Sequence, residues 1–560
     1  MPANLQLRQL ELLRHSFHAA RVSHLLARLA TRRFPDAPSL LRFHEALLFF
    51  RAFPPTPAVL HQTERLLQTF AARIAQLHAA GHDLSDLDTF EASGIAGTTM
   101  QDTLSFDVVR WLVRRLPRAA EIVWDDYEDE RAMGLIWPLL MPLQAEDAWV
   151  EANIPWRKWL GAAHPASKPE LRWLVEQIEK FPGSATDHSR TYDQLRLPIR
   201  WSLADHRYSR TLNWTTPRQI FYHREPLIPR NQVSLARELT QPPPRLHKLP
   251  RAAGERVMHR IREIMLVRYR ELYGTTLGDP ASVVRADLGR GVTIHLWNLP
   301  PDRRLPLRAY VAGFTLKNGV PINYIEAIGL CEWMEVGFNT FYTFRGGEVA
   351  WIFAQVLRCL CRLMRTTCIS MYPYQLGDQN DEAIESGAYW FYRKLGFRPA
   401  RKDLVKLVEQ EERKIAANPT YRTSARTLRR LASAHLIYEL PNTEAGAWDH
   451  FSTRNLGLAA NHRMAREFRG DAASLRRVAS GRLAKLLYVS PARWTPLERQ
   501  ALEDFATILV NVREITSWST TEKQALVELI RAKSAPAEMR YLHLTQKHAR
   551  LRKILLKLGS

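Results

Sequence analysis

Apolar residues recur at helical spacing through the first third of the chain. The segments LLRFHEALLFFRAF, TERLLQTFAARIAQLHAAGHD and SFDVVRWLVRRLPRAAEIVW place them at positions i, i+3 or i+4, and i+7, as in a helix with one apolar face. Residues 1–180 are therefore predicted to form a mainly helical region. Pro138 and Pro142 interrupt the apolar run GLIWPLLMPL, so we expect a buried turn or a broken helix there.

The pattern changes at about residue 181. Residues 181–253 have little helical period and are rich in Pro, Arg, Tyr and Trp, including the run Pro242–Pro244. Such a composition is typical of an irregular arm or a linker. Basic residues interleaved with aromatic ones can also line a nucleic-acid groove, which is the alternative interpretation of this segment.

Residues 254–440 combine helix and strand patterns. GERVMHRIREIMLVRYRELYG predicts a helix that ends at Gly274, after which apolar residues alternate with polar ones as in strands. The dipeptide Asn318-Gly319, flanked by alternating apolar positions, predicts a β-hairpin. CEWMEVGFNTFYTF predicts a further strand that runs directly into a glycine turn, FRGGEVA, and then into a buried helix over 348–364.

The remaining pattern completes a mixed fold. TTCISMYPYQL predicts a strand, AIESGAYWFYRKLG a helix ended by Gly396, and HLIYEL a returning strand over 435–440. Residues 441–560 return to helical periodicity. We therefore predict an α/β (α+β) architecture in which a mixed central sheet flanked by helices, residues 254–440, lies between large, mainly helical N- and C-terminal regions.

Composition narrows the class of protein. Apolar residues make up 46% of the chain, as in a globular protein, and no apolar run reaches the roughly 18 residues of a membrane span. The acidic run from Asp125 to Glu130 lacks His or a loop glycine at ligand spacing, so a solvated loop is favoured over a metal site. We expect a cytoplasmic protein without a metal. The four cysteines are expected to be reduced core residues: Cys331, Cys359, Cys361 and Cys368.

The chain is strongly basic, with a net charge of +22. Residues 401–560 hold 29 Lys and Arg against 16 Asp and Glu, so this region carries +13 of that excess. A basic surface favours partners that bear phosphates, and nucleic acid is a candidate partner of this region. Arg greatly outnumbers Lys, which is also typical of GC-rich bacterial genomes, so composition by itself does not establish nucleic-acid binding.

Two segments resemble the GNAT superfamily of acyl-CoA-dependent N-acyltransferases. The loop RGGEVA, which begins at Arg345, is similar to the family's Arg/Gln-x-x-Gly-x-Gly/Ala pyrophosphate loop, and AYWFYRKLGF (388–397) is similar to its last-helix pattern. The likeness covers roughly residues 255–440. Two positions depart from the family pattern: Glu348 stands where the loop has Gly, and Glu385 stands where the helix often has Asn.

The resemblance implies a site for acetyl-CoA or another acyl-CoA as co-substrate. Backbone N–H groups at the start of a helix, together with the charge of Arg345, would hold the pyrophosphate. The pantetheine would lie between the strands that end near Phe344 and Tyr374. The residues so implied in binding are Phe344, Arg345, Gly346, Gly347, Glu348, Val349 and Ala350.

The reaction implied is transfer of the acyl group to an amine, whose identity the sequence does not give. By resemblance, Tyr392 would protonate the leaving thiolate. The carboxylates available as the base are Glu332 and Glu335, on the strand before the glycine turn, and Glu326 on the hairpin.

Two other functions stay open. The basic C-terminal region favours a nucleic-acid-associated protein that uses the same scaffold. An aminoacyl-tRNA-dependent transferase of related fold would reconcile that basic surface with Glu348, because no CoA pyrophosphate would then lie beside the carboxylate.

Overall fold

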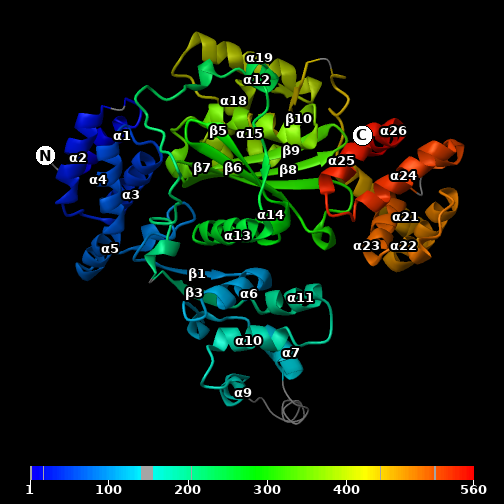
Figure 1. Ribbon diagram of the computed structural model, residues 1–560, viewed down its shortest axis with the longest axis horizontal. Helices are drawn as coiled ribbons and strands as arrows, with labels where there is room; N and C mark the ends of the chain where they lie inside the picture. Colours follow the sequence, from blue (N-terminus) through cyan, green and yellow to red (C-terminus); the bar gives the residue numbers. More distant parts are fainter. Residues whose placement is uncertain (1–2, 17, 141–155, 204, 442, 510–511) are drawn as a thin grey trace. The chain divides into compact units, whose positions relative to one another are not determined.

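The protein is described by a computed structural model that covers residues 3–16, 18–140, 156–203, 205–441, 443–509 and 512–560 (Figure 1). These residues form two compact units, and neither unit is one continuous stretch of chain. The first unit comprises Met1–Pro226, Val257–Leu277 and Asn318–Pro321. The second comprises Leu227–Arg256, Gly278–Lys317 and Ile322–Ser560.

The first unit opens with helices, as the periodicity predicts: α1 (Ala3–Leu12), α2 (Ala19–Ala30), α3 (Ala37–Ala52), α4 (Pro57–Gln68) and α5 (Phe70–Ala79). Helix α3 is buried along nearly its whole length. It begins where the Asp36 carboxylate accepts a hydrogen bond of 2.8 Å from the Ser39 N–H, which satisfies one of the N–H groups left unpaired in the first turn.

A three-stranded antiparallel sheet follows, which the sequence did not predict. Its strands β1 (Thr99–Thr103), β2 (Ala120–Ile122) and β3 (Pro198–Ser202) lie in the order β1-β3-β2. The prediction of a mainly helical region up to residue 180 is therefore wrong for β1 and β2. Both strands are short, and their shared partner β3 comes from the segment interpreted as an arm, so no long alternating pattern marks them.

Helices complete the first unit around a core that includes Val109, Trp137, Leu174 and Trp201. Pro138 lies inside α7, which continues to Leu140, whereas Pro142 lies outside the described residues. The helices are α6 (Phe106–Arg115), α7 (Glu130–Leu140), α9 (Trp156–Ala163), α10 (Glu170–Ile178), α11 (Ala185–Leu195) and α14 (Tyr273–Thr276).

Helix α13 (Arg251–Leu266) contributes residues to both units, and it ends before the predicted Gly274. Tyr269 adopts a left-handed backbone with φ of 51°. The Arg270 N–H then bonds back to the Met265 carbonyl at 3.1 Å, which closes the helix end in the manner of a Schellman cap. The sequence prediction missed this end because the apolar period continues past it and no glycine marks it.

The second unit is built on a nine-stranded sheet in the order β11-β12-β10-β9-β8-β7-β6-β5-β4. Strands β9 and β10 are parallel, while the pairs β4–β5, β5–β6, β6–β7, β8–β9, β10–β12 and β11–β12 are antiparallel. The strands are β4 (His247–Lys248), β5 (Val284–Gly289), β6 (Val292–Asn298), β7 (Ala309–Lys317), β8 (Val320–Leu330), β9 (Trp333–Thr340), β10 (Cys368–Met371), β11 (Arg398–Pro399) and β12 (Leu436–Glu439).

The predicted hairpin is confirmed between β7 and β8. Asn318 and Gly319 connect them with φ values of 48° and 80°, the left-handed conformations that a tight hairpin turn requires. The returning strand predicted over 435–440 is confirmed as β12.

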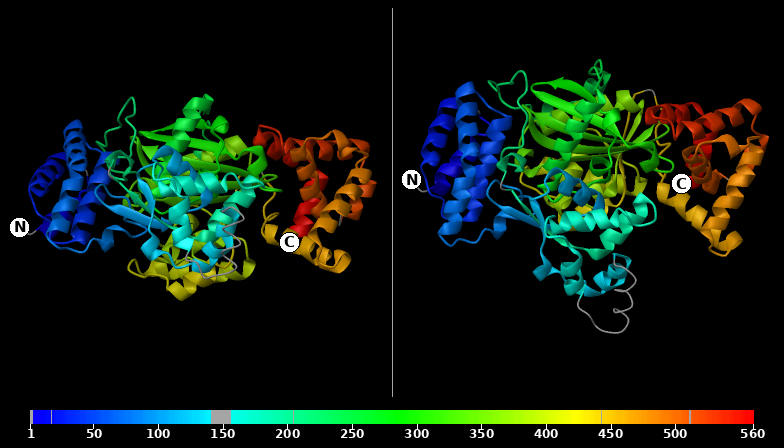
Figure 2. Two further views of the ribbon diagram at one scale, coloured as in Figure 1. Left: turned by 90° about the horizontal axis from the view of Figure 1, so that it is seen from below. Right: turned by 60° about the horizontal axis from the view of Figure 1, so that its bottom comes forward.

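Helices flank the sheet, so the mixed α/β class predicted from sequence is confirmed (Figures 1 and 2). The helix predicted up to Gly396 is two helices, α17 and α18, because Gly387 between them has φ of 67°. No helix in the described ranges is long and apolar enough to cross a membrane. The helices are α12 (Leu235–Thr240), α15 (Val349–Met364), α16 (Pro373–Leu376), α17 (Asp381–Glu385), α18 (Ala388–Arg393), α19 (Lys402–Ala417), α20 (Ala425–Ala432), α21 (Thr453–Phe468), α22 (Ala472–Leu486), α23 (Pro496–Leu509), α24 (Thr520–Ala532), α25 (Glu538–Lys547) and α26 (Ala549–Gly559).

Candidate functional site

Strands β9 and β10 separate where the chain approaches the glycine turn. Their parallel pairing ends at Ser370 opposite Glu335, because β10 stops at Met371 and the chain turns into α16 at Pro373. Strand β9 continues through Val336–Thr340, paired with β8 on its other side. Within the described part of the chain, that stretch of β9 has no strand partner on the β10 side, so the sheet leaves its backbone groups on that side unpaired.

The glycine turn links this strand edge to helix α15. A short 3₁₀ turn, Tyr342–Phe344, precedes it, and the Gly347 N–H bonds to the Phe344 carbonyl at 2.9 Å. Among the described residues, no acceptor bonds to the N–H groups of Gly346, Glu348, Val349 or Ala350. Unpaired N–H groups at the positive end of a 16-residue helix attract an anion.

The negative charge of the Glu348 carboxylate is compensated by neighbouring side chains. Its side chain is fully buried, forms an ion pair with Arg290 and lies 3.5 Å from the Lys317 ammonium. It also accepts a hydrogen bond of 3.2 Å from the Ile228 N–H. Two cations therefore offset the carboxylate that departs from the family pattern. Burial lowers the pKa of Lys317 to about 7.

Arg345 lies at the exposed rim of the turn. Its guanidinium forms an ion pair with Glu382 of α17 and lies 5.6 Å from the centre of the Tyr342 ring. Its side chain is 37% exposed, so a ligand phosphate would compete with Glu382 for an accessible cation.

A polar pair, Ser370 and His435, lies where β9 and β10 separate, and sequence reasoning missed it. Ser370 and Glu335 are register partners and therefore project to one face of the sheet. The Ser370 Oγ lies 2.7 Å from the Nδ1 of His435, and burial lowers the pKa of His435 to about 4, so the imidazole is neutral near pH 7. Only the β10–β12 pairing brings Ser370 and His435 together, and no spacing in the sequence signals it.

Glu335 is the predicted base that lies at this point of strand separation. Its carboxylate is 3.5 Å from Arg308, and burial raises its pKa. Glu326 pairs in register with Gly337 and therefore shares the face of Glu335. It accepts a hydrogen bond from the Tyr310 hydroxyl.

Glu332 lies elsewhere, in the turn before β9. It accepts hydrogen bonds from the Trp448 indole at 2.7 Å and from Arg552 at 2.6 Å. These contacts hold C-terminal segments to the start of β9, the end of the strand that is remote from the glycine turn.

Tyr392 lies on the opposite face of the sheet from Glu335. Its ring is 5.5 Å from Phe353 of α15, and Phe353 packs at 4.9 Å against Phe338 of β9. Phe338 and Glu335 are an odd number of positions apart on one strand and so point to opposite faces. Burial raises the pKa of Tyr392. The structure therefore does not bring the predicted acid and base together on one surface.

Comparisons with protein-family models, curated proteins and solved structures give no match for this chain. Within the described residues, no group of three or more His, Cys, Asp or Glu side chains is arranged to hold a metal ion. Inferences about function therefore rest on the residues and geometry described above.

Proposed function

We propose that this chain is an N-acyltransferase that moves an acyl group from acyl-CoA to an amine. One observation carries the proposal: the unpaired edge of β9 leads toward a glycine turn in which, among the described residues, the N–H groups of Gly346, Glu348, Val349 and Ala350 have no acceptor at the start of α15. An extended donor with an anionic end matches both features. Its amides would pair with Val336–Thr340, while its pyrophosphate would accept hydrogen bonds from the turn and from Arg345.

The carbonyl of the donor thioester would then lie toward the Glu335–Ser370 end of the edge. An amine attacks the carbonyl carbon and its proton passes to a base. The C–S bond breaks, and the CoA thiolate leaves and takes a proton from an acid. Glu335 is our proposed base because burial raises its pKa toward the range in which a carboxylate accepts and returns protons readily. Tyr392 stays a candidate acid through resemblance, although it contacts the other face of the sheet.

Calorimetric titration with acetyl-CoA and longer acyl-CoAs tests the donor site. Arg345→Glu is expected to weaken binding roughly tenfold or more, because hydrogen bonds to charged groups contribute about 1.5–3 kcal/mol. Arg362→Glu, on the exposed side of α15, is the matched control and is expected to bind normally. Glu382→Gln is expected to strengthen binding by releasing Arg345. Folded protein that binds none of these acyl-CoAs contradicts the proposal.

A second candidate function is nucleic-acid binding, which the exposed face of α22 favours. This helix exposes Arg476, Arg477, Arg482 and Lys485. Tyr488 follows it with 81% of its surface exposed. Cations beside an exposed aromatic ring suit the backbone and bases of a single strand. A transferase whose donor is an aminoacyl-tRNA would combine acyl transfer with nucleic-acid binding. Such a protein is expected to bind RNA and to bind no acyl-CoA.

A further inference from the structure

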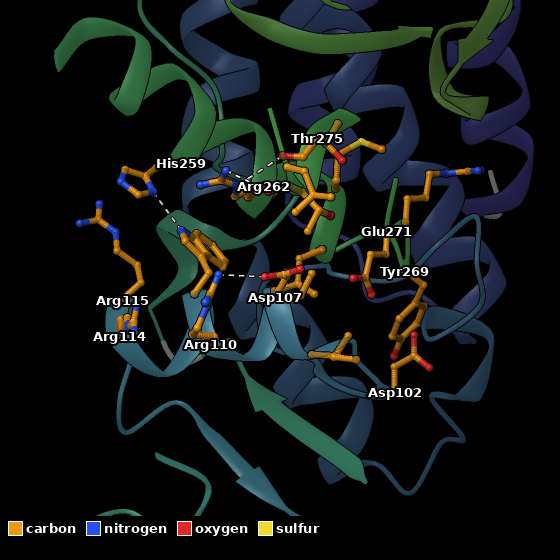
Figure 3. A pocket seen from close by; sticks show the side chains of 18 residues that line it. Asp102, Asp107, Arg110, Arg114, Arg115, His259, Arg262, Tyr269, Glu271 and Thr275 are labelled. Carbon is orange, nitrogen blue, oxygen red and sulfur yellow. Dashed lines mark hydrogen bonds and ion pairs between the residues drawn. The ribbon is translucent and has the colours of Figure 1, made fainter. Parts of the chain in front are cut away.

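The first unit contains a cavity of about 480 Å³ that is separate in sequence from the glycine turn (Figure 3). Its walls come from the end of β1 and Leu104, from α6, from the last turns of α13 and from the segment that follows to Leu277. This volume is within the range of small-molecule sites, which are roughly 300–1,000 Å³. The apolar part of the lining includes Leu104, Val108, Trp111 and Met265.

Arginine side chains gather at one side of the cavity, together with the imidazole of His259. In Figure 3, Arg110, Arg114, Arg115 and His259 lie on one side with Asp107 beside Arg110, while Asp102 and Glu271 lie on the other side. Arg110 forms an ion pair with Asp107 at 2.8 Å, and Arg114 forms one with Glu179 at 2.5 Å. The Glu263 carboxylate is 3.9 Å from Arg115, beyond hydrogen-bond distance, and the Arg115 side chain is 50% exposed. The guanidinium therefore keeps donors for an anionic group.

His259 is fixed in this wall by Trp111. The indole N–H donates to the His259 Nδ1 at 2.9 Å. Because an indole can only donate, this bond assigns the acceptor role to Nδ1 and places the imidazole proton on Nε2.

The opposite side of the cavity is acidic, with Asp102 and Glu271 beside Tyr269 (Figure 3). Burial raises the pKa of both carboxyl groups. Neither has a cationic partner within 4 Å among the described residues. The Tyr269 hydroxyl is already engaged, since it donates to Asp88 at 2.5 Å and accepts from the Gln101 N–H at 3.1 Å. A positive group on a ligand would offset the crowded negative charge.

We propose that this cavity binds a small zwitterion with an apolar body, of the kind that a short free peptide presents. Its ammonium group would lie at Asp102 and Glu271, and its carboxylate at Arg115. The apolar body would contact Trp111 and Met265. This site does not depend on the proposed acyltransferase activity.

Titration of the full chain with two tripeptides, alanyl-phenylalanyl-alanine and alanyl-leucyl-alanine, tests the site at low ionic strength. Each is compared with its N-acetylated form, which lacks the ammonium, and its C-amidated form, which lacks the carboxylate. In the unmodified protein, either blocking group is expected to weaken binding at least tenfold. In Asp102→Asn, acetylation should no longer weaken binding, whereas amidation still should. In Arg115→Gln, amidation should no longer weaken binding, whereas acetylation still should.

Arg118→Gln serves as the matched control, because Arg118 is exposed just beyond α6 and does not line the cavity. Circular dichroism and thermal unfolding establish that each variant is folded. Three results overturn the proposal. The first is no saturable binding of either free tripeptide, and the second is equal affinity of the unmodified protein for the free and blocked peptides. The third is that each variant loses the same affinity for the free, acetylated and amidated peptides. Any other pattern with charge-specific losses at Asp102 and Arg115 supports it.

Discussion

Glu348 shows how a single residue changes meaning between sequence and structure. In the sequence it is an acid placed beside an expected pyrophosphate. In the structure its carboxylate lies among Arg290, Lys317 and the Ile228 N–H. Buried charges persist when they are paired and hydrogen-bonded. The Glu348 carboxylate therefore links the start of α15 to Ile228, Arg290 and Lys317 and does not accept from the N–H groups of the turn.

Glu348→Gln is expected to lower the free energy of unfolding by about 3 kcal/mol, because removing one partner leaves buried cations uncompensated. Glu382→Gln breaks a pair whose side chains are 37% and 39% exposed and is expected to cost less than about 1 kcal/mol. Urea unfolding at pH 7 measures both. If both substitutions lowered the free energy of unfolding equally, burial would not strengthen the Glu348 contacts.

His295 on β6 makes the free energy of unfolding depend on pH. Burial, with a smaller effect from Arg285, lowers its pKa to about 4. The unfolded chain, with an ordinary pKa near 6.5, binds more protons between these values, so stability is lost as pH falls from about 6.5 to 4. The loss at pH 5 is expected to be about 2 kcal/mol.

His295→Gln is expected to remove that part of the pH dependence. The measurement is the difference in unfolding free energy between pH 7 and pH 5, compared between the two proteins, which cancels the contribution of other titrating groups. An unchanged difference would place the His295 pKa near its ordinary value.

At the scale of elements, short features decide where the strands and helices end. Strand β10 ends because Pro373 begins α16, and this leaves the edge of β9 unpaired. Gly387 divides the predicted last helix in two, since its left-handed backbone cannot continue a helix. Pro373 and Gly387 can be read from the sequence. Their consequences, an unpaired edge of β9 and a divided helix, depend on the elements beside them.

Two glycines offer opposite predictions for one kind of substitution. A Cβ at either Gly387 or Gly481 would contact nothing within 4 Å. Gly387 has φ of 67°, so Gly387→Ala is expected to destabilise by about 1–2 kcal/mol. Gly481 lies inside α22, so Gly481→Ala is expected to stabilise by up to about 1 kcal/mol. Denaturant unfolding gives both values, and shifts of the same sign would contradict the backbone argument.

At the scale of the whole molecule, the two units interleave along the chain. Three separate stretches make up each unit, so neither can be excised as one segment and experiments require the full chain. Net charge is also a whole-chain property, and its +22 is concentrated toward the C-terminal helices. Such a distribution governs association with polyanions more than it governs folding.

Binding of fluorescent single-stranded RNA tests whether the face of α22 is used. If it is, affinity should fall steeply with salt. Replacing Arg476, Arg477, Arg482 and Lys485 with Gln should reduce the slope of log affinity against log salt by up to about 3. Gln substitutions at the exposed α19 residues Lys402, Lys406 and Arg413 are the control. Similar reductions in both variants would assign the binding to net charge alone, and an unchanged slope in the α22 variant would show that this face is not used.

The sequence by itself determined those features that neighbouring residues control. Asn318-Gly319 imposed a turn through backbone conformations that few other residues adopt. Helical periodicity gave α3, α15 and the C-terminal helices, because one apolar face must be buried whatever packs against it. The strand, glycine turn and helix around Arg345 follow from the same local rules.

Only the tertiary structure decided which distant residues meet. The sheet placed Ser370 beside His435 and Tyr392 on the face opposite Glu335, and packing placed cations around Glu348. It also brought α6 beside the end of α13 and the segment that follows, which form the cavity of the first unit. These contacts depend on strand order and on long-range packing, which periodicity along one segment does not encode.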